Sequence, residues 1–293
     1  MIRIRAGAPR GVRQGAVVLA VGTCTGLFLH ARRAMLRELR QARAVAGAAQ
    51  DALLRPLPPR VAGLAVAAAL LSADRGAAVG GDLYEVIATE HGVRVVMGDV
   101  RGHGLAALGT AAVVLGSFRE AAHDEPELAG VLRRLERALA RHLRTREGTG
   151  HPVTEDFVTV LLVEIARDGT LRALNCGHPW PYRLSGERAE PVSRIAPLPP
   201  LGPFPLPPDL PVETAGRLLP GEALVLFTDG VEDARDARGR FFPLPDVLTE
   251  AARAGLTSPR PLLHAVLARL AQHAGAGPTD DAAVLTLTPA PAA

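Results

Sequence analysis

Aspartates stand at the ends of four apolar segments of this 293-residue chain, and any fold of the chain must accommodate all of them. They lie in the tripeptides Gly80-Gly81-Asp82, Gly98-Asp99-Val100, Thr228-Asp229-Gly230 and Thr279-Asp280-Asp281. A carboxylate at the end of a buried strand loses hydration, which is unfavourable unless the charge is compensated. One such aspartate is explained by turn capping. Four together predict a shared positive partner.

The first two aspartates allow a prediction of register. Asp82 begins one apolar run and Asp99 closes the next, and their midpoint falls between Glu90 and His91. A symmetric hairpin without a bulge therefore places Asp82 directly opposite Asp99, with Cβ atoms about 4.5–5.5 Å apart. Facing carboxylates persist when they share a proton or a cation.

The residue types indicate which cation to expect. Aspartates supplemented by carbonyls and water are ligands for Mg²⁺ or Mn²⁺, whereas zinc normally recruits His or Cys. Two such ions about 3.5–4 Å apart can activate a water molecule and hold a phosphoryl oxygen. The sequence therefore predicts metal-assisted phosphoester hydrolysis.

Hydrophobic periodicity predicts an α+β domain. The expected strands are 64–71, 82–88, 93–100, 157–165, 171–175, 223–227 and 283–287, and the expected helices are 105–122, 127–144 and 261–273. Neighbouring strands joined by a few residues indicate antiparallel pairing. The segment 188–211 contains nine Pro and is expected to be a loop.

Five short motifs occur in order along the chain: GGDLYE (80–85), GDVRGHG (98–104), NCGHP (175–179), LFTDGV (226–231) and DD (280–281). Together they resemble the bacterial SpoIIE/RsbU-type serine phosphatases of the metal-dependent protein phosphatase superfamily (PPM, protein phosphatase 2C-like). The resemblance covers residues 53–288. It implies a central antiparallel β-sandwich flanked by helices, in the four-layer αββα arrangement of PPM enzymes.

The resemblance also implies an activity. It predicts two Mn²⁺ or Mg²⁺ ions and hydrolysis of phosphoserine or phosphothreonine on a regulatory protein by a metal-activated water. The usual substrate in this family is a phosphorylated anti-sigma factor antagonist with a STAS domain, so the expected output is sigma factor regulation in signal transduction. Two alternatives stay open: a metal-dependent small-molecule phosphohydrolase, and a catalytically silent binding module of the same fold.

Site residues follow from the same resemblance. Asp99 matches the aspartate that bridges both metals, with the Val100 carbonyl beside it. Asp82 matches a ligand of one metal and Asp229 a ligand of the other. At the last motif the ligand falls on Asp280, and Asp281 remains a second possibility.

Three positions depart from the family pattern without removing a predicted ligand. They are Glu85, Arg101 and Cys176. Arg101 stands where classical eukaryotic relatives have a candidate acid histidine, and His103 follows two residues later. His103 is therefore given no catalytic role, and an active enzyme is expected.

The N-terminal region differs from the rest in charge. Residues 1–60 carry 11 Arg and two acids, whereas residues 61–293 carry 22 Arg and 28 acids. Within the basic segment 1–33, residues 14–31 lack Asp, Glu and Arg, and 18 helical residues span roughly 27 Å. We expect a single transmembrane helix that holds the protein at the cytoplasmic face of the membrane. The alternative is a buried segment of a cytoplasmic protein.

A second helix is expected after the apolar segment. Residues 34–55 are predicted to form a linker helix whose stripe over 35–53 could support a homodimer. Prolines then mark the start of the phosphatase domain, 56–293.

Composition excludes several other functions. All 33 basic residues are Arg, which removes the lysine that P-loops, protein kinases and pyridoxal enzymes require. The acidic body with 3% aromatic residues argues against nucleic acid as a partner.

Overall fold

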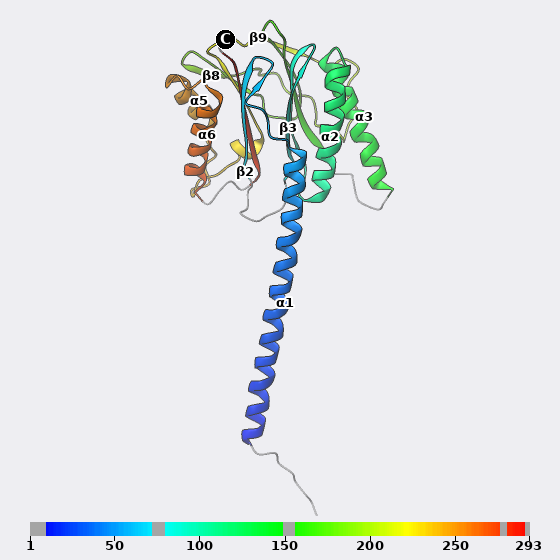
Figure 1. The fold of residues 1–293 in the computed structure, drawn as a ribbon, viewed down its shortest axis with the longest axis vertical. Coiled ribbons are helices and arrows are strands. Elements are labelled where there is room, and N and C mark those ends of the chain that lie inside the picture. The colour runs from blue at the N-terminus through cyan, green and yellow to red at the C-terminus, as the bar shows by residue number, and fades with distance from the viewer. Residues whose placement is uncertain (1–9, 72–79, 149–155, 276–279, 291–293) are drawn as a thin grey trace, which may run out of the picture. The chain divides into compact units, whose positions relative to one another are not determined.

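A computed structural model describes residues 10–71, 80–148, 156–275 and 280–290 of the chain. The chain divides into two compact units, Met1–Val45 and Ala46–Ala293. Helix α1 (Arg10–Leu53) runs without a break through the predicted apolar segment and most of the predicted linker helix (Figure 1). It ends three residues before Pro56. The predicted domain limits and the dimer remain predictions.

The second unit contains two antiparallel sheets. The first has the strand order β1-β2-β11-β10-β7-β8 and the second has the order β3-β4-β5-β6-β9. The strands of the first sheet are β1 (Arg60–Val61), β2 (Leu64–Leu71), β7 (Tyr182–Ser185), β8 (Arg188–Pro191), β10 (Ala223–Phe227) and β11 (Ala282–Pro289). Those of the second are β3 (Asp82–Thr89), β4 (Gly92–Val100), β5 (Val158–Ile165), β6 (Thr170–Cys176) and β9 (Glu213–Arg217).

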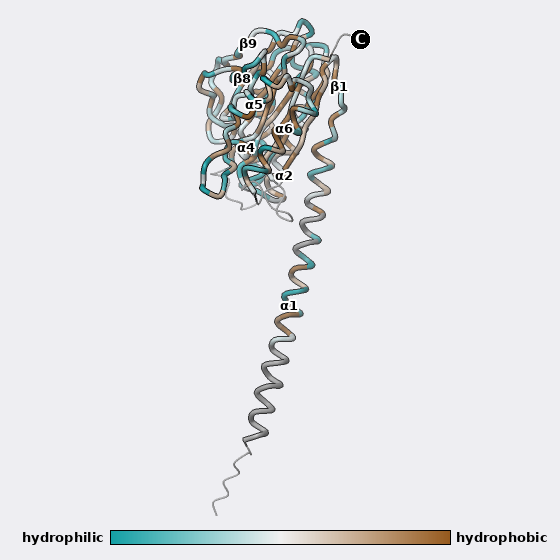
Figure 2. The backbone as a smooth tube through the Cα atoms, turned by 90° about the vertical axis from the view of Figure 1, so that its left-hand side faces the viewer, coloured by the Kyte–Doolittle hydropathy of each residue, from teal (hydrophilic) through white to brown (hydrophobic). Residues whose placement is uncertain are grey.

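The sheets pack face to face, with helices on both outer faces (Figure 1). Helices α2 (Leu105–Asp124) and α3 (Leu128–Glu147) cover the second sheet, while α5 (Leu244–Arg253) and α6 (Pro259–Ala274) cover the first. Alternation along β4 explains the layering, because Val95 and Met97 face the core between the sheets whereas Val96 faces α2 and α3. Apolar segments accordingly gather in the strands (Figure 2). The predicted four-layer fold is confirmed.

Helix α2 belongs to the domain core. Among the residues whose side chains the structure describes, it is the one helix long and apolar enough to cross a membrane. Its Val114, Leu115 and Phe118 side chains are fully buried against the second sheet and α3. Composition alone therefore does not make it a membrane span.

Two arginines tie the helices to the second sheet. Arg94 of β4 is fully buried, pairs with Glu164 of β5 at 2.7 Å and donates to the Ala122 carbonyl at 2.9 Å. It also donates to the carbonyls of Glu125 and Pro126, which fixes the α2–α3 turn. Arg119 of α2 donates to Glu85 of β3 at 2.5 Å and to the Leu53 carbonyl at 2.8 Å.

Several elements were missing from the sequence prediction. The predicted loop 188–211 is wrong at its start, because Arg188–Pro191 forms β8 and pairs with β7. Its remainder is irregular, as expected. Strands β7 and β9 were not predicted because each is short. Helix α5 was also missed, although its buried residues recur at helical spacing. A further turn of helix, α4 (Asp229–Glu232), begins at a predicted site residue.

Candidate metal centre

The paired aspartates of the second sheet lie as the sequence predicts. The β3–β4 ladder is regular from Thr89↔Gly92 to Asp82↔Asp99, so the two carboxylates are directly opposite one another. Asp82 is only 4% exposed. Burial raises its pKa well above the usual range, and the charge of Asp99 adds to the effect.

Asp99 is perturbed in the same direction. Burial raises its pKa to about 7, and the charges of Asp229, Asp280 and Asp281 contribute. Without a cation, the site therefore holds protons that ordinary aspartates have lost at neutral pH.

The first sheet supplies the remaining aspartates. Strands β10 and β11 are antiparallel neighbours, with Phe227 opposite Val284. Asp229 follows β10, whereas Asp281 immediately precedes β11, so these residues meet at one end of the sheet. This end of the first sheet lies beside the end of the β3–β4 hairpin that carries Asp82 and Asp99.

The two sheet ends enclose a cavity of about 160 Å³. Its lining consists of Gly81, Asp82, Asp99, Gly102, His103, Asp229, Asp280 and Asp281. All five predicted aspartates thus share one cavity, and both Asp280 and Asp281 line it. His103, to which the sequence assigned no role, lines it too.

A threonine missed by the sequence prediction joins the sheets at this point. The Thr228 hydroxyl donates to the Asp82 carboxylate at 2.9 Å and accepts the Ala283 backbone N–H at 2.8 Å. The side chain is completely buried. In the sequence, its place in Thr-Asp-Gly suggested only a turn. Its position directly before Asp229 was the one feature that could have pointed to a role at the site.

Three glycines leave room for the acidic groups. A Cβ at Gly80 would lie 1.7 Å from the Asp281 Oδ2 atom, and one at Gly81 would lie 2.1 Å from the Val100 carbonyl oxygen. A Cβ at Gly230 would lie 1.9 Å from the Asp281 carbonyl oxygen. A side chain at any of these three positions would clash with neighbouring oxygen atoms, so glycine is required there. The Val100 carbonyl, a predicted metal ligand, lies in this tightly packed region.

The NCGHP motif (175–179) supports Asp99 indirectly, through the hydroxyl of Thr159. Asn175 accepts the His178 N–H at 2.9 Å and donates to the His178 carbonyl at 2.8 Å. The His178 Nδ1 atom lies 3.0 Å from the Thr159 hydroxyl, which accepts the Asp99 N–H at 3.1 Å. Burial lowers the His178 pKa to about 3, so the ring is neutral. Sequence reasoning missed both His178 and Thr159.

The donor set fits a hard divalent cation. Carboxylates crowd one cavity with a backbone carbonyl beside them, and the raised pKa values of Asp82 and Asp99 indicate negative charge that a cation would relieve. Among the described residues, no three His, Cys, Asp or Glu side chains form a ready-made cage for one ion. Water and carbonyl ligands would therefore complete the coordination, as Mg²⁺ commonly requires.

Comparisons with known proteins give one family match. A family model described as Stage II sporulation protein E (SpoIIE) matches residues 89–289, a segment that contains Asp99, Asp229, Asp280 and Asp281 and begins after Asp82. A search of curated proteins gave no match.

Solved structures share the fold. The SiaA-PP2C domain of Pseudomonas aeruginosa matches with a TM-score of 0.65 and 20% identity, covering 88% of this chain and 98% of that chain. The RsbU and RsbW domains of a Mycobacterium tuberculosis protein match with a TM-score of 0.61 and 23% identity over 78% of this chain, which spans 61% of theirs. RsbX in complex with magnesium matches with a TM-score of 0.57 and 14% identity, covering 78% of this chain and 96% of that chain.

Proposed function

The chain belongs to the SpoIIE family of PPM phosphatases, and we propose that it removes phosphate from phosphoserine or phosphothreonine on a STAS-domain anti-sigma factor antagonist. The observation that carries the proposal is the convergence of Asp82, Asp99, Asp229, Asp280 and Asp281 on one cavity. The RsbU–RsbW and RsbX matches support a partner-switching context.

We propose that the cavity binds two Mn²⁺ or Mg²⁺ ions. Asp82, Asp99, Asp229 and Asp280 or Asp281 would hold them together with the Val100 carbonyl. Bound divalent ions would activate water for attack on phosphorus and neutralise phosphoryl oxygens. The magnesium bound to RsbX supports this choice of ion.

The protein's own residues orient this arrangement. The Thr228 hydroxyl holds the Asp82 carboxylate, and the Thr159 hydroxyl holds the Asp99 backbone. Both contacts come from elements other than the strand they support, so the carboxylates are positioned before a substrate arrives. We propose that the phosphoryl group enters this small cavity while the attached protein stays outside.

The test is metal-dependent phosphate release by the full chain from a phosphorylated STAS-domain protein. Asp99→Asn should reduce turnover by more than the ~100-fold that loss of an outer hydrogen-bond partner of a metal ligand costs. Asp209→Asn is the matched control, because Asp209 is exposed and does not line the cavity. Unchanged turnover in Asp99→Asn would refute the assignment.

The same assay separates the alternatives. Turnover of p-nitrophenyl phosphate without turnover of the phosphoprotein would favour a small-molecule phosphohydrolase. Stable binding of the STAS-domain protein without any phosphate release would favour the silent binding module.

We also propose that residues 14–31 hold the enzyme at the cytoplasmic face of the membrane. Support comes from the lack of charge in this segment and from its place within the continuous helix α1. Membrane fractionation of cells that express the full chain or a variant lacking 1–33 tests it. Equal recovery of both in the soluble fraction would contradict the anchor. Sedimentation of the full chain tests the homodimer proposed through 35–53.

A further inference from the structure

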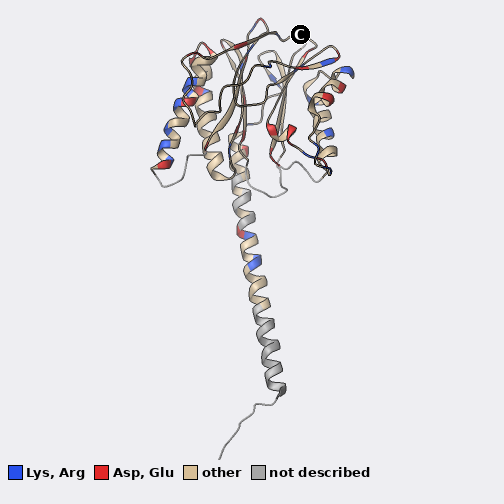
Figure 3. Ribbon diagram, turned by 180° about the vertical axis from the view of Figure 1, so that it is seen from behind, with Lys and Arg blue, Asp and Glu red and all other residues tan. Residues whose placement is uncertain are grey.

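Helix α3 is strongly basic although it belongs to an acidic domain. It carries six Arg and two Glu, whereas residues 61–293 as a whole contain 22 Arg and 28 acids. Figure 3 shows the arginines repeated along this helix. A concentration of one charge on one element indicates either internal ion pairing or an external partner.

Internal contacts account for half of these arginines. Arg133 donates to the Pro207 carbonyl at 2.8 Å, Arg134 pairs with Glu125 and Asp124, and Arg146 pairs with Asp156 at 2.6 Å. Arg137, Arg141 and Arg144 are exposed and have no hydrogen bond or ion pair with any described residue.

The three unpaired arginines lie on one face of α3. They are spaced four and three residues apart, which places them side by side along a helix. Their guanidinium groups are therefore available together to one extended binding partner.

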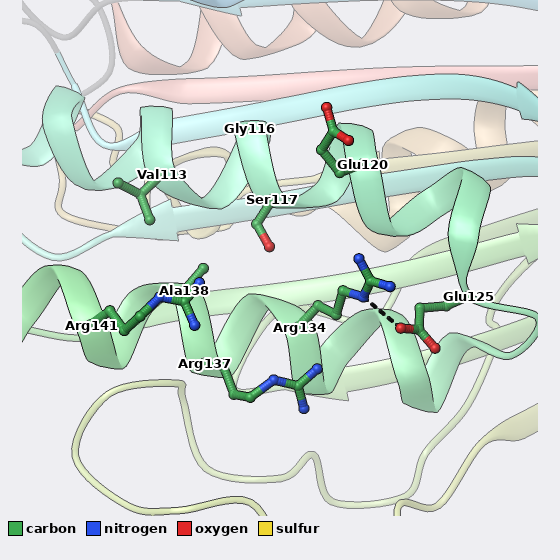
Figure 4. Close-up of a pocket in the computed structure, with 9 residues that line it drawn as sticks. All are labelled: Val113, Gly116, Ser117, Glu120, Glu125, Arg134, Arg137, Ala138 and Arg141. Carbon is green, nitrogen blue, oxygen red and sulfur yellow. Dashed lines mark hydrogen bonds and ion pairs between the residues drawn. The ribbon is translucent and has the colours of Figure 1, made fainter.

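Arg137 and Arg141 also border a groove between α2 and α3 with a volume of about 610 Å³. Val113 and Ser117 of α2 point toward α3 across this space (Figure 4). Gly116 and Ala138 contribute little bulk, and a Cβ at Gly116 would meet no atom within 4 Å. The groove thus combines a shallow, mostly small-residue floor with a cationic wall.

We propose that this groove is a docking site for an acidic segment of a partner protein. The rigid forks of Arg137 and Arg141 suit carboxylates, which they bind through two parallel hydrogen bonds. Acidic residues four apart in a helical segment would match their spacing. Small side chains between those acids would lie over Gly116 and Val113.

The charges that line the groove favour a protein segment over an anionic bilayer. Glu125 is paired with Arg134, but Glu120 also lines the groove and would repel a continuous sheet of lipid phosphates. A segment of limited length can place its carboxylates beside Arg137 and Arg141 and avoid Glu120.

The probe is a synthetic alanine-rich helical peptide with glutamates four residues apart, and its matched peptide has glutamine at those positions. Binding to the full chain is measured by fluorescence anisotropy. We expect the glutamate peptide to bind with an affinity that falls as salt rises, and the glutamine peptide to bind at least about tenfold more weakly.

Three variants localise the binding. Arg137→Glu with Arg141→Glu should weaken it at least about tenfold. Arg253→Glu with Arg260→Glu makes the same charge change at exposed positions of α5 and α6 and should leave it within about twofold. Gly116→Met fills the groove without changing charge and should weaken binding while thermal unfolding remains cooperative.

Specific outcomes would overturn the proposal. Equal binding of both peptides would exclude recognition of carboxylates. An equal loss of peptide binding in the control with Arg253→Glu and Arg260→Glu would show that net charge alone explains the effect. Capture of the protein by phosphatidylserine vesicles through Arg137 and Arg141, with no peptide binding, would assign the face to a membrane.

Discussion

Replacing Thr228 with valine tests whether one hydroxyl unites the two halves of the metal centre. Valine keeps the shape of the side chain and removes both hydrogen bonds, to the Asp82 carboxylate and from the Ala283 N–H. Thr228→Ser is the matched control, because it retains the hydroxyl and loses one methyl group.

The expected destabilisation follows from burial. Leaving a buried N–H unsatisfied costs about 1–3 kcal/mol, and a hydrogen bond to an uncharged carboxyl group contributes about 0.5–1.5 kcal/mol. We expect Thr228→Val to lower the free energy of unfolding by about 2–4 kcal/mol in the metal-free protein. Because folded domains are stable by about 5–15 kcal/mol, the variant should remain folded. Thr228→Ser should lose about 1 kcal/mol.

The substitution should also weaken metal binding. The Thr228 hydrogen bond lowers the pKa of Asp82 against the opposing effect of burial, so its loss raises that pKa further. A higher Asp82 pKa makes the proton a stronger competitor of the metal for this carboxylate.

Two measurements decide the outcome. Urea unfolding followed by circular dichroism gives the stability change, and Mn²⁺ titration of p-nitrophenyl phosphate turnover gives the metal concentration at half-maximal activity. The reasoning is refuted if Thr228→Val and Thr228→Ser have stabilities within about 0.5 kcal/mol of each other, since that is the range of ordinary surface substitutions. It is equally refuted if both variants need the same Mn²⁺ concentration.

Three further predictions concern other features of the domain. The folded-state pKa values of Asp99 and Asp82 lie above the unfolded value of 3.8. The metal-free protein should therefore lose stability as pH rises from about 4 through about 7. Urea unfolding at pH 5 and pH 8 checks the sign of this change, and added Mn²⁺ should reverse it. Gly230→Ala should abolish metal-dependent activity because its Cβ would lie 1.9 Å from a carbonyl oxygen, whereas Gly109→Ala in α2 meets nothing and should stabilise the helix by up to about 1 kcal/mol in thermal unfolding. Arg94→Met should lower the free energy of unfolding by about 3–5 kcal/mol because it removes one partner of a buried ion pair and leaves three carbonyls unpaired, and a loss under about 1 kcal/mol would contradict that account.

The sequence predicts the Asp82–Asp99 pairing because the information is local. A short symmetric hairpin fixes its own register, and apolar runs of eight or nine residues identify both strands. The same reasoning finds β2, β10, β11, α2 and α3, which show apolar runs or a clear apolar periodicity in the sequence.

The convergence of the two sheets could be inferred only through the family resemblance. Nothing near Asp229 in the sequence indicates that it faces a hairpin some 130 residues earlier, because sheet packing depends on every core side chain at once. For the same reason the supporting contacts from Thr228, Thr159 and His178 were not predicted. A threonine or histidine in a turn motif has many possible partners until the fold selects one.

Short elements escaped prediction for a different reason. β8 has four residues, too few for an alternation to emerge from the sequence, whereas helix α5 was missed although its buried residues recur at helical spacing. β8 also lies in a proline-rich segment, where it forms the edge of the sheet and so needs few backbone donors.

The division of the acidic cavity between the two sheets has a mechanical consequence. Asp82 and Asp99 move with one sheet, and Asp229 and Asp281 move with the other. A slip of one residue between the sheets, about 3.3 Å, would carry the carboxylates out of reach of a common ion. Any ion bound there would therefore hold the two sheets together at that end of the sandwich. Release of the ion would loosen the contact between the sheets at that end only.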